Sequence, residues 1–249
     1  MRRFDDKVAV VTGGGRDIGK AIALRLAGEG AKVVITCKAS VESGAEVVRS
    51  IEARGGEAFL VTADLTTPEG AERLVGTVRE CFGSLDVLVH NTGGMVARRK
   101  LPQMDLAFWN EVMAVNLTSL FLTTKALVPL LNDGSAIVAL ASQAGRDGGG
   151  SGALAYATSK GAVITYTRAL SKELGPATRV NAICPGMIDT TFHDTFTKPE
   201  VRQRLTETAP MRRQGRPEDV AALAAFLASD DAGYVTGAAY DINGGVMWS

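Results

Sequence analysis

The sequence predicts an α/β protein built on a doubly wound parallel sheet with helices on both faces. Two observations predict this class. Short apolar runs alternate with amphipathic stretches almost to the end of the chain, which is the pattern of successive β-α-β units. Many of the 28 glycines gather where the apolar runs end, and an open α/β sheet binds its ligands at that edge. Residues 1–249 are expected to form one domain with a Rossmann-like fold.

Seven apolar runs are predicted to be strands, because they are rich in Val, Ile and Ala and apolar on both faces. They cover residues 7–12, 31–36, 58–63, 86–91, 136–142, 179–185 and 239–242. Apolar residues at helical spacing predict helices over residues 18–28, 41–54, 68–82, 105–131 and 153–174. Thr67 and Pro68 mark the start of one helix, and Gly30 follows the end of another.

Composition excludes several classes of protein. Lys plus Arg and Asp plus Glu both number 27, so no overall field attracts nucleic acid or an acidic membrane. The short basic cluster at 98–100 is expected to be a solvated surface. The three cysteines have no metal or redox spacing, which is typical of a reduced cytoplasmic protein. No run approaches the roughly 20 apolar residues of a membrane span, and no metal site is predicted.

The stretch TGGGRDIG, residues 12–19, lies between the first predicted strand and the first helix. A glycine-rich turn there directs main-chain N–H groups and the helix dipole at an anion, as in a phosphate-binding loop. By itself, the motif is equally compatible with a tight turn that binds nothing. The residues expected to contact a dinucleotide here are Gly13, Gly15, Arg16, Ile18 and Gly19.

Two further positions bear on the cofactor. Asp64 and Leu65 follow the third predicted strand and are suited to the edge of an adenine, although Asp64 is equally suited to capping a helix. At the end of the second strand, an acidic residue would bind the ribose of NAD and a basic one the 2′-phosphate of NADP. Lys38 stands there without a carboxylate, and together with Arg16 it favours NADP(H) over NAD(H). A merely solvated Lys38 would leave NAD open.

The stretch Tyr156-Ala157-Thr158-Ser159-Lys160 lies in a predicted helix. Residues four apart share one helix face, so the phenol and the ammonium are expected to lie close together. A nearby cation lowers the pKa of a phenol, which makes Tyr156 a usable general acid or base. Such a pair is common by chance. Ser142 at the end of a strand and Asn116 in the preceding long helix make chance a poor explanation.

With these marks the chain resembles the short-chain dehydrogenase/reductase family, in the family's order and spacing from residue 7 to about residue 245. The matching stretches are T12-G13 with G19, H90-N91-T92-G93, N116, S142, Y156-x-x-x-K160 and P185-G186 followed by T190. The resemblance implies a cytoplasmic NAD(P)-dependent oxidoreductase that interconverts a carbonyl and an alcohol. Further cofactor contacts are then expected from Asn91, Gly93, Pro185, Gly186, Ile188 and Thr190.

The resemblance also implies roles for four residues. Tyr156 would protonate the carbonyl oxygen, while Lys160 would lower the Tyr156 pKa and hold the nicotinamide ribose. Ser142 would orient the carbonyl, and Asn116 would hold a water molecule of the proton relay. Read without the family, Ser142 is a strand-end cap and Asn116 a polar residue that bends a helix.

Three positions depart from the family pattern: Asp17 replaces Gly or Ala, His90 replaces Asn, and Thr92 replaces Ala. The Asp17 carboxylate is expected to turn away from the phosphates and to cap the helix or pair with Arg16 or another cation. His90 is expected to be a sheet-end residue with satisfied hydrogen bonds.

The loop after Ser142 is polar and glycine-rich, which favours a small polar or acidic substrate. Gln143, Arg146 and His193 are the expected substrate contacts beside Ser142 and Tyr156, with Arg146 placed to bind a carboxylate. An Arg146–Asp147 surface pair or a subunit contact is the alternative. Residues 142–163 and 186–202 are similar to segments of bacterial reductases that act on the open-chain keto-uronate (4-deoxy-hexoseulose uronate) released from alginate.

The main alternative is a sensor of the same fold that binds a dinucleotide without turnover. Asp17 favours this reading, and the intact Asn116, Ser142, Tyr156 and Lys160 set opposes it. A serine hydrolase is disfavoured because the chain has no G-x-S-x-G elbow. The C-terminal stretch 240–245 resembles a segment used in family tetramers, so a homotetramer is expected.

Overall fold

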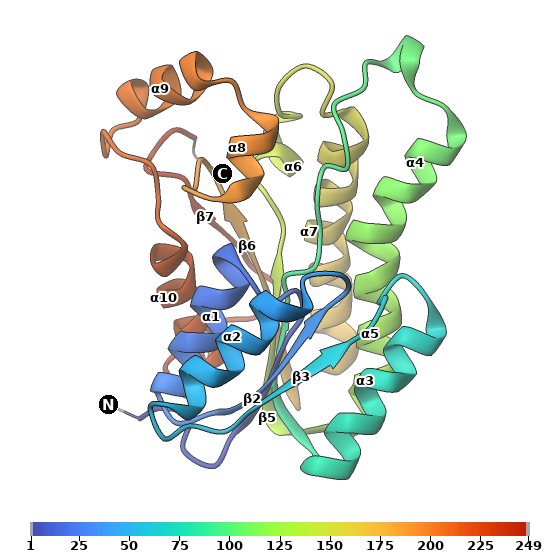
Figure 1. The fold of residues 1–249 in the computed structure, drawn as a ribbon, viewed down its shortest axis with the longest axis vertical. Coiled ribbons are helices and arrows are strands. Elements are labelled where there is room, and N and C mark those ends of the chain that lie inside the picture. The colour runs from blue at the N-terminus through green and yellow to red at the C-terminus, as the bar shows by residue number, and fades with distance from the viewer. Residues whose placement is uncertain (1, 248–249) are drawn as a thin grey trace.

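The computed structural model describes residues 2–247, and its seven strands form one parallel sheet in the order β3-β2-β1-β4-β5-β6-β7 (Figure 1). The strands are β1 (Val8–Val11), β2 (Lys32–Cys37), β3 (Ala58–Thr62), β4 (Leu85–His90), β5 (Leu131–Leu140), β6 (Thr178–Pro185) and β7 (Ala239–Ile242). The predicted doubly wound sheet is therefore confirmed. The strand order reverses between β1 and β4, which is where such a sheet leaves a crevice for a ligand.

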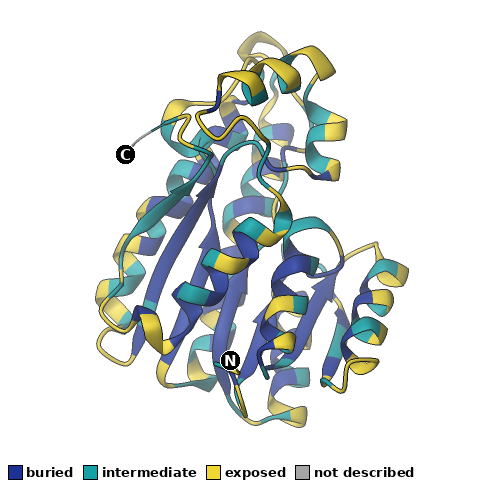
Figure 2. Cartoon of the chain, turned by 90° about the vertical axis from the view of Figure 1, so that its left-hand side faces the viewer, coloured by how far each residue is buried: buried dark blue, intermediate teal, exposed yellow. Residues whose placement is uncertain are grey.

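Both faces of the sheet are buried, as Figure 2 shows by its dark central strands under partly exposed helices. Successive residues of β1 face opposite sides: Ala9 and Val11 belong to one apolar cluster, and Val8 and Val10 to another. The alternation follows from the two-residue period of a strand. Because both sets are apolar, the strand reads as a continuous hydrophobic run.

Helices cover both faces. The first face carries α1 (Asp17–Gly28), α2 (Val41–Glu52) and α10 (Pro217–Ala228), whose apolar residues join the cluster of Ala9 and Val11. The second carries α3 (Pro68–Cys81), α5 (Ser119–Leu127) and α7 (Leu154–Leu174). Thr67 caps α3 as its sequence predicts, because its hydroxyl accepts a hydrogen bond from the Gly70 N–H at 3.2 Å.

The predicted helix over residues 105–131 is divided. It contains α4 (Leu106–Met113), a π-helical turn at Ala114–Thr118 and α5, and it ends in a 3₁₀ turn at Val128–Leu130. The remaining helices were not predicted: α6 (Ala144–Asp147), α8 (Thr191–Phe196), α9 (Pro199–Thr208) and α10. None of the residues of α6, α8 and α9 is buried, so these helices leave no apolar period in the sequence. α10 is apolar on most sides, and its period is hidden for that reason.

The continuous helical run Leu106–Leu130 is long and apolar enough to cross a membrane, with a mean hydropathy of 1.3. The run departs from the expectation that no segment approaches a membrane span. This property rests on length and composition alone, and buried helices of folded domains share it. Here the run packs against α3 and α7, and Phe108, Val112 and Leu127 are buried in the protein.

Candidate functional site

A cavity of about 960 Å³ opens at the carboxyl ends of the central strands, beneath α8 and α9. Every residue predicted to contact the cofactor lines it, from the glycine loop through Lys38 and Asp64 to Thr190. Ser142, Gln143, Tyr156, Lys160 and His193 line it as well. The structure thus collects in one place residues that lie up to about 180 positions apart.

The glycine loop is compact because its glycines have no room for side chains. A Cβ on Gly19 would lie 2.2 Å from the Gly13 oxygen and 2.5 Å from Asn91 Nδ2. Asn91 holds the loop by donating Nδ2–H to the Gly13 oxygen at 2.9 Å. The loop leads directly into α1, whose first-turn N–H groups have no partner within the helix. The residues present therefore fit the pyrophosphate of a dinucleotide.

Gly93 is a second position in the site with no room for a side chain. A Cβ there would lie 2.7 Å from Asn116 Oδ1 and 3.0 Å from Lys160 Nζ. Without one, both polar side chains remain within reach of the cavity edge. This arrangement leaves space for the nicotinamide end of the same cofactor.

Asn116 stands one layer behind the cavity wall. It is buried in the π-helical turn, where Nδ2 donates to the oxygens of Gly94 at 2.8 Å and Val112 at 2.9 Å, and Oδ1 accepts from the Gly94 N–H at 3.0 Å. The Asn116 side chain competes with the main chain for the Val112 oxygen. This competition explains the local widening of the helix into a π turn. Asn116 thus lies in a local irregularity of the helix, and the predicted water contact stays a prediction.

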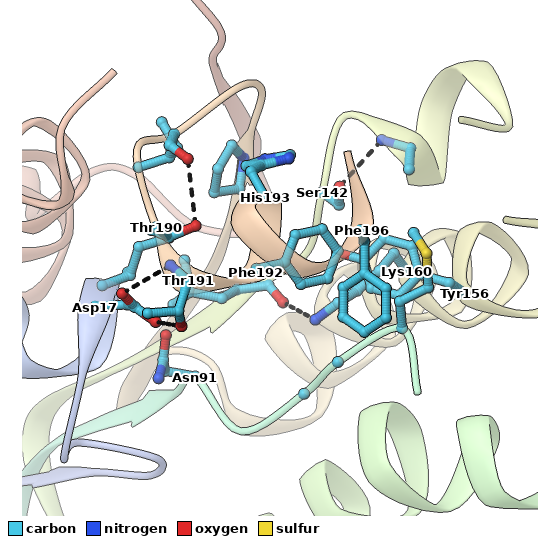
Figure 3. Close-up of a pocket in the computed structure, with 18 of the residues that line it drawn as sticks. Asp17, Asn91, Ser142, Tyr156, Lys160, Thr190, Thr191, Phe192, His193 and Phe196 are labelled. Atoms are coloured by element: carbon cyan, nitrogen blue, oxygen red, sulfur yellow. Dashed lines mark hydrogen bonds between the residues drawn. The ribbon is translucent and has the colours of Figure 1, made fainter. Parts of the chain in front are cut away.

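Tyr156 and Lys160 project from α7 into the cavity, one helical turn apart, and Ser142 approaches from the loop after β5 (Figure 3). Lys160 is buried, lies 6.0 Å from the centroid of the Tyr156 ring, and donates to the Leu140 oxygen at 2.6 Å. Burial lowers the pKa of Lys160 to about 8.

The Tyr156 phenol behaves differently from the expectation. Burial raises its pKa, and the hydrogen bond with Ser142 acts in the opposite direction. The expected lowering of the Tyr156 pKa by Lys160 was wrong, because desolvation dominates. A phenol that stays protonated at neutral pH is suited to donating a proton to a carbonyl.

Two predicted positions have simple structural explanations. His90 is only 4% exposed, and its Nε2 lies 2.9 Å from Thr124 Oγ1, which confirms a satisfied sheet-end residue. Burial lowers its pKa to about 3, so the ring is neutral. Lys38 Nζ forms an ion pair with Asp64 Oδ2 at 2.7 Å at the adenosine end, and the Lys38 bond lowers the Asp64 pKa to about 2.

Arg146 does not contact the cavity, and the expectation that it binds substrate was wrong. Its Nη2 donates to the Ala239 oxygen at 2.7 Å, and its Nε pairs with Asp241 Oδ1 at 2.7 Å. The side chains of Arg146 and Asp241 are 15% and 14% exposed. The alternative Arg146–Asp147 pair is also not formed, since Asp147 accepts from Gln143 Nε2 at 2.9 Å.

Arg98 is exposed, as expected for the cluster at 98–100, and it also lines the cavity, which the sequence did not predict. Its Nε donates to the Phe196 oxygen at 2.7 Å and its Nη1 to the Ser151 oxygen at 3.0 Å. No local pattern distinguishes it from Arg99, which stacks on the Phe108 ring 4.4 Å from the centroid.

The expected polar character of the site holds for only part of the cavity. The ring of Phe192 lies 5.7 Å from Tyr156 and 5.1 Å from Phe196, centroid to centroid, and forms an apolar wall. His193 lines the cavity too, with Nδ1 2.8 Å from Thr197 Oγ1. Burial, followed by the charges of Arg202 and Arg98, lowers the pKa of His193 to about 4, so it carries no charge at neutral pH.

Asp17 begins α1 with φ +48°, a conformation that glycine adopts more easily and that explains the family's usual residue. Its carboxylate does not cap the helix, so that alternative was wrong, while the alternative of a pair with Arg16 is met only by a long contact. Instead Oδ2 accepts from Thr191 Oγ1 at 2.5 Å, and Oδ1 accepts from the Thr191 N–H at 3.2 Å. Arg16 Nε is a distant partner at 3.9 Å.

Comparison with known proteins gives consistent results. The sequence model of the enoyl-(acyl carrier protein) reductase family matches residues 13–247. The chain is 37% identical to a 3-oxoacyl-[acyl-carrier-protein] reductase of Synechocystis, over 99% of each chain. It is also 37% identical to glucose 1-dehydrogenase 2 of Bacillus subtilis, over 96% of this chain and 94% of the relative.

A solved structure shares both fold and sequence. A short-chain dehydrogenase from Burkholderia cenocepacia in complex with NADP superposes with a TM-score of 0.91 at 34% identity, over 98% of each chain. The family match, the relatives and this structure agree with the crevice and the cluster around Tyr156. The chain therefore belongs to the short-chain dehydrogenase/reductase family and is an NAD(P)-dependent oxidoreductase.

Proposed function

We propose that the protein is an NADP(H)-dependent reductase of a small carbonyl compound that carries an anionic group such as a carboxylate. The observation that carries the substrate class is the position of Arg98 on the cavity wall. A guanidinium has five N–H donors, and main-chain oxygens accept from Arg98 only at Nε and Nη1. The remaining donors suit a carboxylate, which prefers the planar fork of an arginine.

The apolar wall supports a substrate with a carbon skeleton beside its anionic end. Phe192 and Phe196 lie on the same helix, and the Phe196 oxygen receives the Arg98 hydrogen bond. An anion at Arg98 would therefore leave the rest of the molecule against the aromatic rings and Tyr156. Keto-uronates and other short keto acids belong to this class. The relatives named above differ in substrate, so their names do not indicate which short keto acid the protein reduces.

The residues around Tyr156 would carry out the reduction. The nicotinamide supplies the hydride when it is bound. The protonated Tyr156 phenol donates its proton to the carbonyl oxygen, and the Ser142 hydroxyl orients that oxygen. Lys160 is held by the Leu140 oxygen at the floor of the cavity, where its ammonium faces the phenol and the ribose site.

The adenosine end supports NADP(H). Lys38 and Arg16 both line the cavity there, and both side chains are 68% exposed and available to a 2′-phosphate. Asp64 already pairs with Lys38, so the phosphate would compete with a carboxylate for that ammonium. Lys38→Ala and Arg16→Ala should therefore weaken binding of NADPH more than of NADH. Equal loss for both cofactors in calorimetric titrations would contradict the assignment.

The substrate class is tested with matched substrates. Short keto acids and their neutral amides or esters are assayed with NADPH by loss of nicotinamide absorbance. Arg98→Gln also removes the hydrogen bond to the Phe196 oxygen of α8, so every substrate can be affected, but KM for the acids should rise by roughly tenfold or more beyond any change for the neutral compounds, as expected for loss of a charge-assisted hydrogen bond. Arg99→Gln is the matched control, because Arg99 packs on Phe108 outside the cavity. No turnover of any carbonyl in the native enzyme would favour the dinucleotide sensor.

Assembly and location are also part of the proposal. Leu106, Phe121 and Leu154 are 72%, 45% and 42% exposed on the outer helices, which supports burial against further copies in a cytoplasmic homotetramer. Light scattering after size-exclusion chromatography tests the number of subunits, and a monomer would contradict it.

A further inference from the structure

The hydrogen bonds between Asp17 and Thr191 join two segments that act on different parts of the reaction. Asp17 belongs to the phosphate-binding loop, and Thr191 is the first residue of α8, 174 positions later. We infer that Asp17 is a positioning residue that holds α8 over the cavity, so that entry of the dinucleotide requires release of this contact. The inference rests on dinucleotide binding and not on the proposed substrate.

The helix that Asp17 holds has little else to fix it. None of the residues of α8 is buried, so apolar burial contributes little to its position. Polar contacts from three directions remain: Asp17 at Thr191, Arg98 at the Phe196 oxygen, and Arg202 with Asp194 at 2.6 Å. A short helix held by a few exposed hydrogen bonds opens at low free energy. Loss of any one of these contacts should therefore change how often α8 opens.

The position of α8 matters for the chemistry because the next residue is Phe192. Figure 3 shows Asp17 and Thr191 side by side, with Phe192 and His193 beyond them toward Tyr156. The Phe192 ring lies 5.7 Å from the Tyr156 ring, and His193 is in edge contact with Phe192 at 5.1 Å. Loss of the Asp17 contact would move these rings away from the site where the carbonyl must lie.

The carboxylate also occupies a position that matters for the cofactor. It stands at the first residue of α1, where main-chain N–H groups and the helix dipole attract the pyrophosphate. Two anions at this position repel each other, and the Arg16 Nε, 3.9 Å away, is too distant and exposed to neutralise one fully. The Asp17 carboxylate that bonds to Thr191 thus competes with the cofactor for this position. A glycine at position 17 would provide neither the hydrogen bonds to Thr191 nor the negative charge.

Substitutions at Thr191 and at Asp17 distinguish the effect of the hydrogen bonds between these residues from the effect of the Asp17 charge. Thr191→Val removes the hydroxyl donor and keeps the Asp17 charge, and Thr191→Ser restores the hydroxyl. Asp17→Asn removes the charge and keeps an oxygen that can accept from the Thr191 N–H. Thr195→Val is the matched control, since the Thr195 hydroxyl donates to the Thr191 oxygen within α8 and not to Asp17.

Hydrogen–deuterium exchange of peptides covering residues 189–198 is measured on the protein without cofactor or substrate. We expect exchange in Thr191→Val to be about three- to tenfold faster than in the native protein, as for loss of a partly exposed hydrogen bond to a charged group. Thr191→Ser and Thr195→Val should remain near the native rate. Unchanged exchange in Thr191→Val, or an equal increase in Thr195→Val, would overturn the inference.

Cofactor entry gives a second, independent measurement. Stopped-flow fluorescence with NADPH should show about three- to tenfold faster association in Thr191→Val, because the closed state is less populated. Asp17→Asn should bind NADPH and NADH more tightly, while hydrogen–deuterium exchange in its α8 stays closer to native than that of Thr191→Val. Native association rates in Thr191→Val would contradict the coupling, even if the substrate proposal failed for its own reasons.

Discussion

Replacement of His90 by Asn, the residue that the family has at this position, should flatten the pH dependence of stability. The pKa of His90 is lowered from 6.5 to about 3 by burial, so the folded protein keeps the ring neutral where the unfolded chain takes up a proton. Stability from neutral His90 is therefore complete above about pH 6.5 and is lost as the pH falls toward about 3.

The size of the effect follows from the two pKa values. Between pH 7 and pH 5 the unfolded ring becomes largely protonated and the folded ring does not, which costs roughly 2 kcal/mol of unfolding free energy. For a chain of this length, that loss corresponds to a decrease in Tm of roughly 4–8 °C. The change is assignable because the chain has only 2 histidines, and few other groups titrate in this interval.

The assay compares Tm at pH 7 and pH 5 for the native protein, His90→Asn and His193→Asn. Removal of His90 should abolish most of the difference between the two pH values, whatever it does to Tm at pH 7. His193 also has a lowered pKa, of about 4, but it lies on α8, which has no buried residue, and it can take up its proton when this helix opens locally. His193→Asn should therefore keep the native slope. An equal slope in the native protein and His90→Asn would refute the reasoning.

Three further outcomes are expected. Tyr156→Phe should lower kcat by roughly 10²–10⁴-fold while the Kd of NADPH stays near the native value, since only the proton donor is lost; near-native kcat would contradict its role. Gly19→Ala should abolish measurable binding of both cofactors in titration calorimetry, because the new Cβ would lie 2.2 Å from the Gly13 oxygen and displace the loop. Arg146→Gln should lower the unfolding free energy in urea by about 1–3 kcal/mol through loss of its pair with Asp241, and leave substrate KM unchanged. A raised KM in that variant would restore Arg146 as a substrate contact.

Local sequence determined the sheet and most of the site. Strands that are buried on both faces must be apolar throughout, so β1, with Val8 and Val10 on one face and Ala9 and Val11 on the other, is visible in the sequence. The glycine loop is equally visible, because the close approach of Gly19 to Gly13 admits no side chain. Tyr156 and Lys160 follow from helical spacing alone.

Only the tertiary structure decided the contacts made across long stretches of chain. The sequence favoured Arg146 as the cation of the substrate site and gave no reason to choose Arg98, but in the structure Arg146 pairs with Asp241 on β7 while Arg98 lines the cavity. Asp17 obeys no local rule: its partner is 174 positions away on a helix without an apolar face. The spacing of apolar residues records what a helix or strand buries, whereas a hydrogen bond between the first residues of two distant helices leaves no such spacing in the sequence. It therefore has to be seen in the fold.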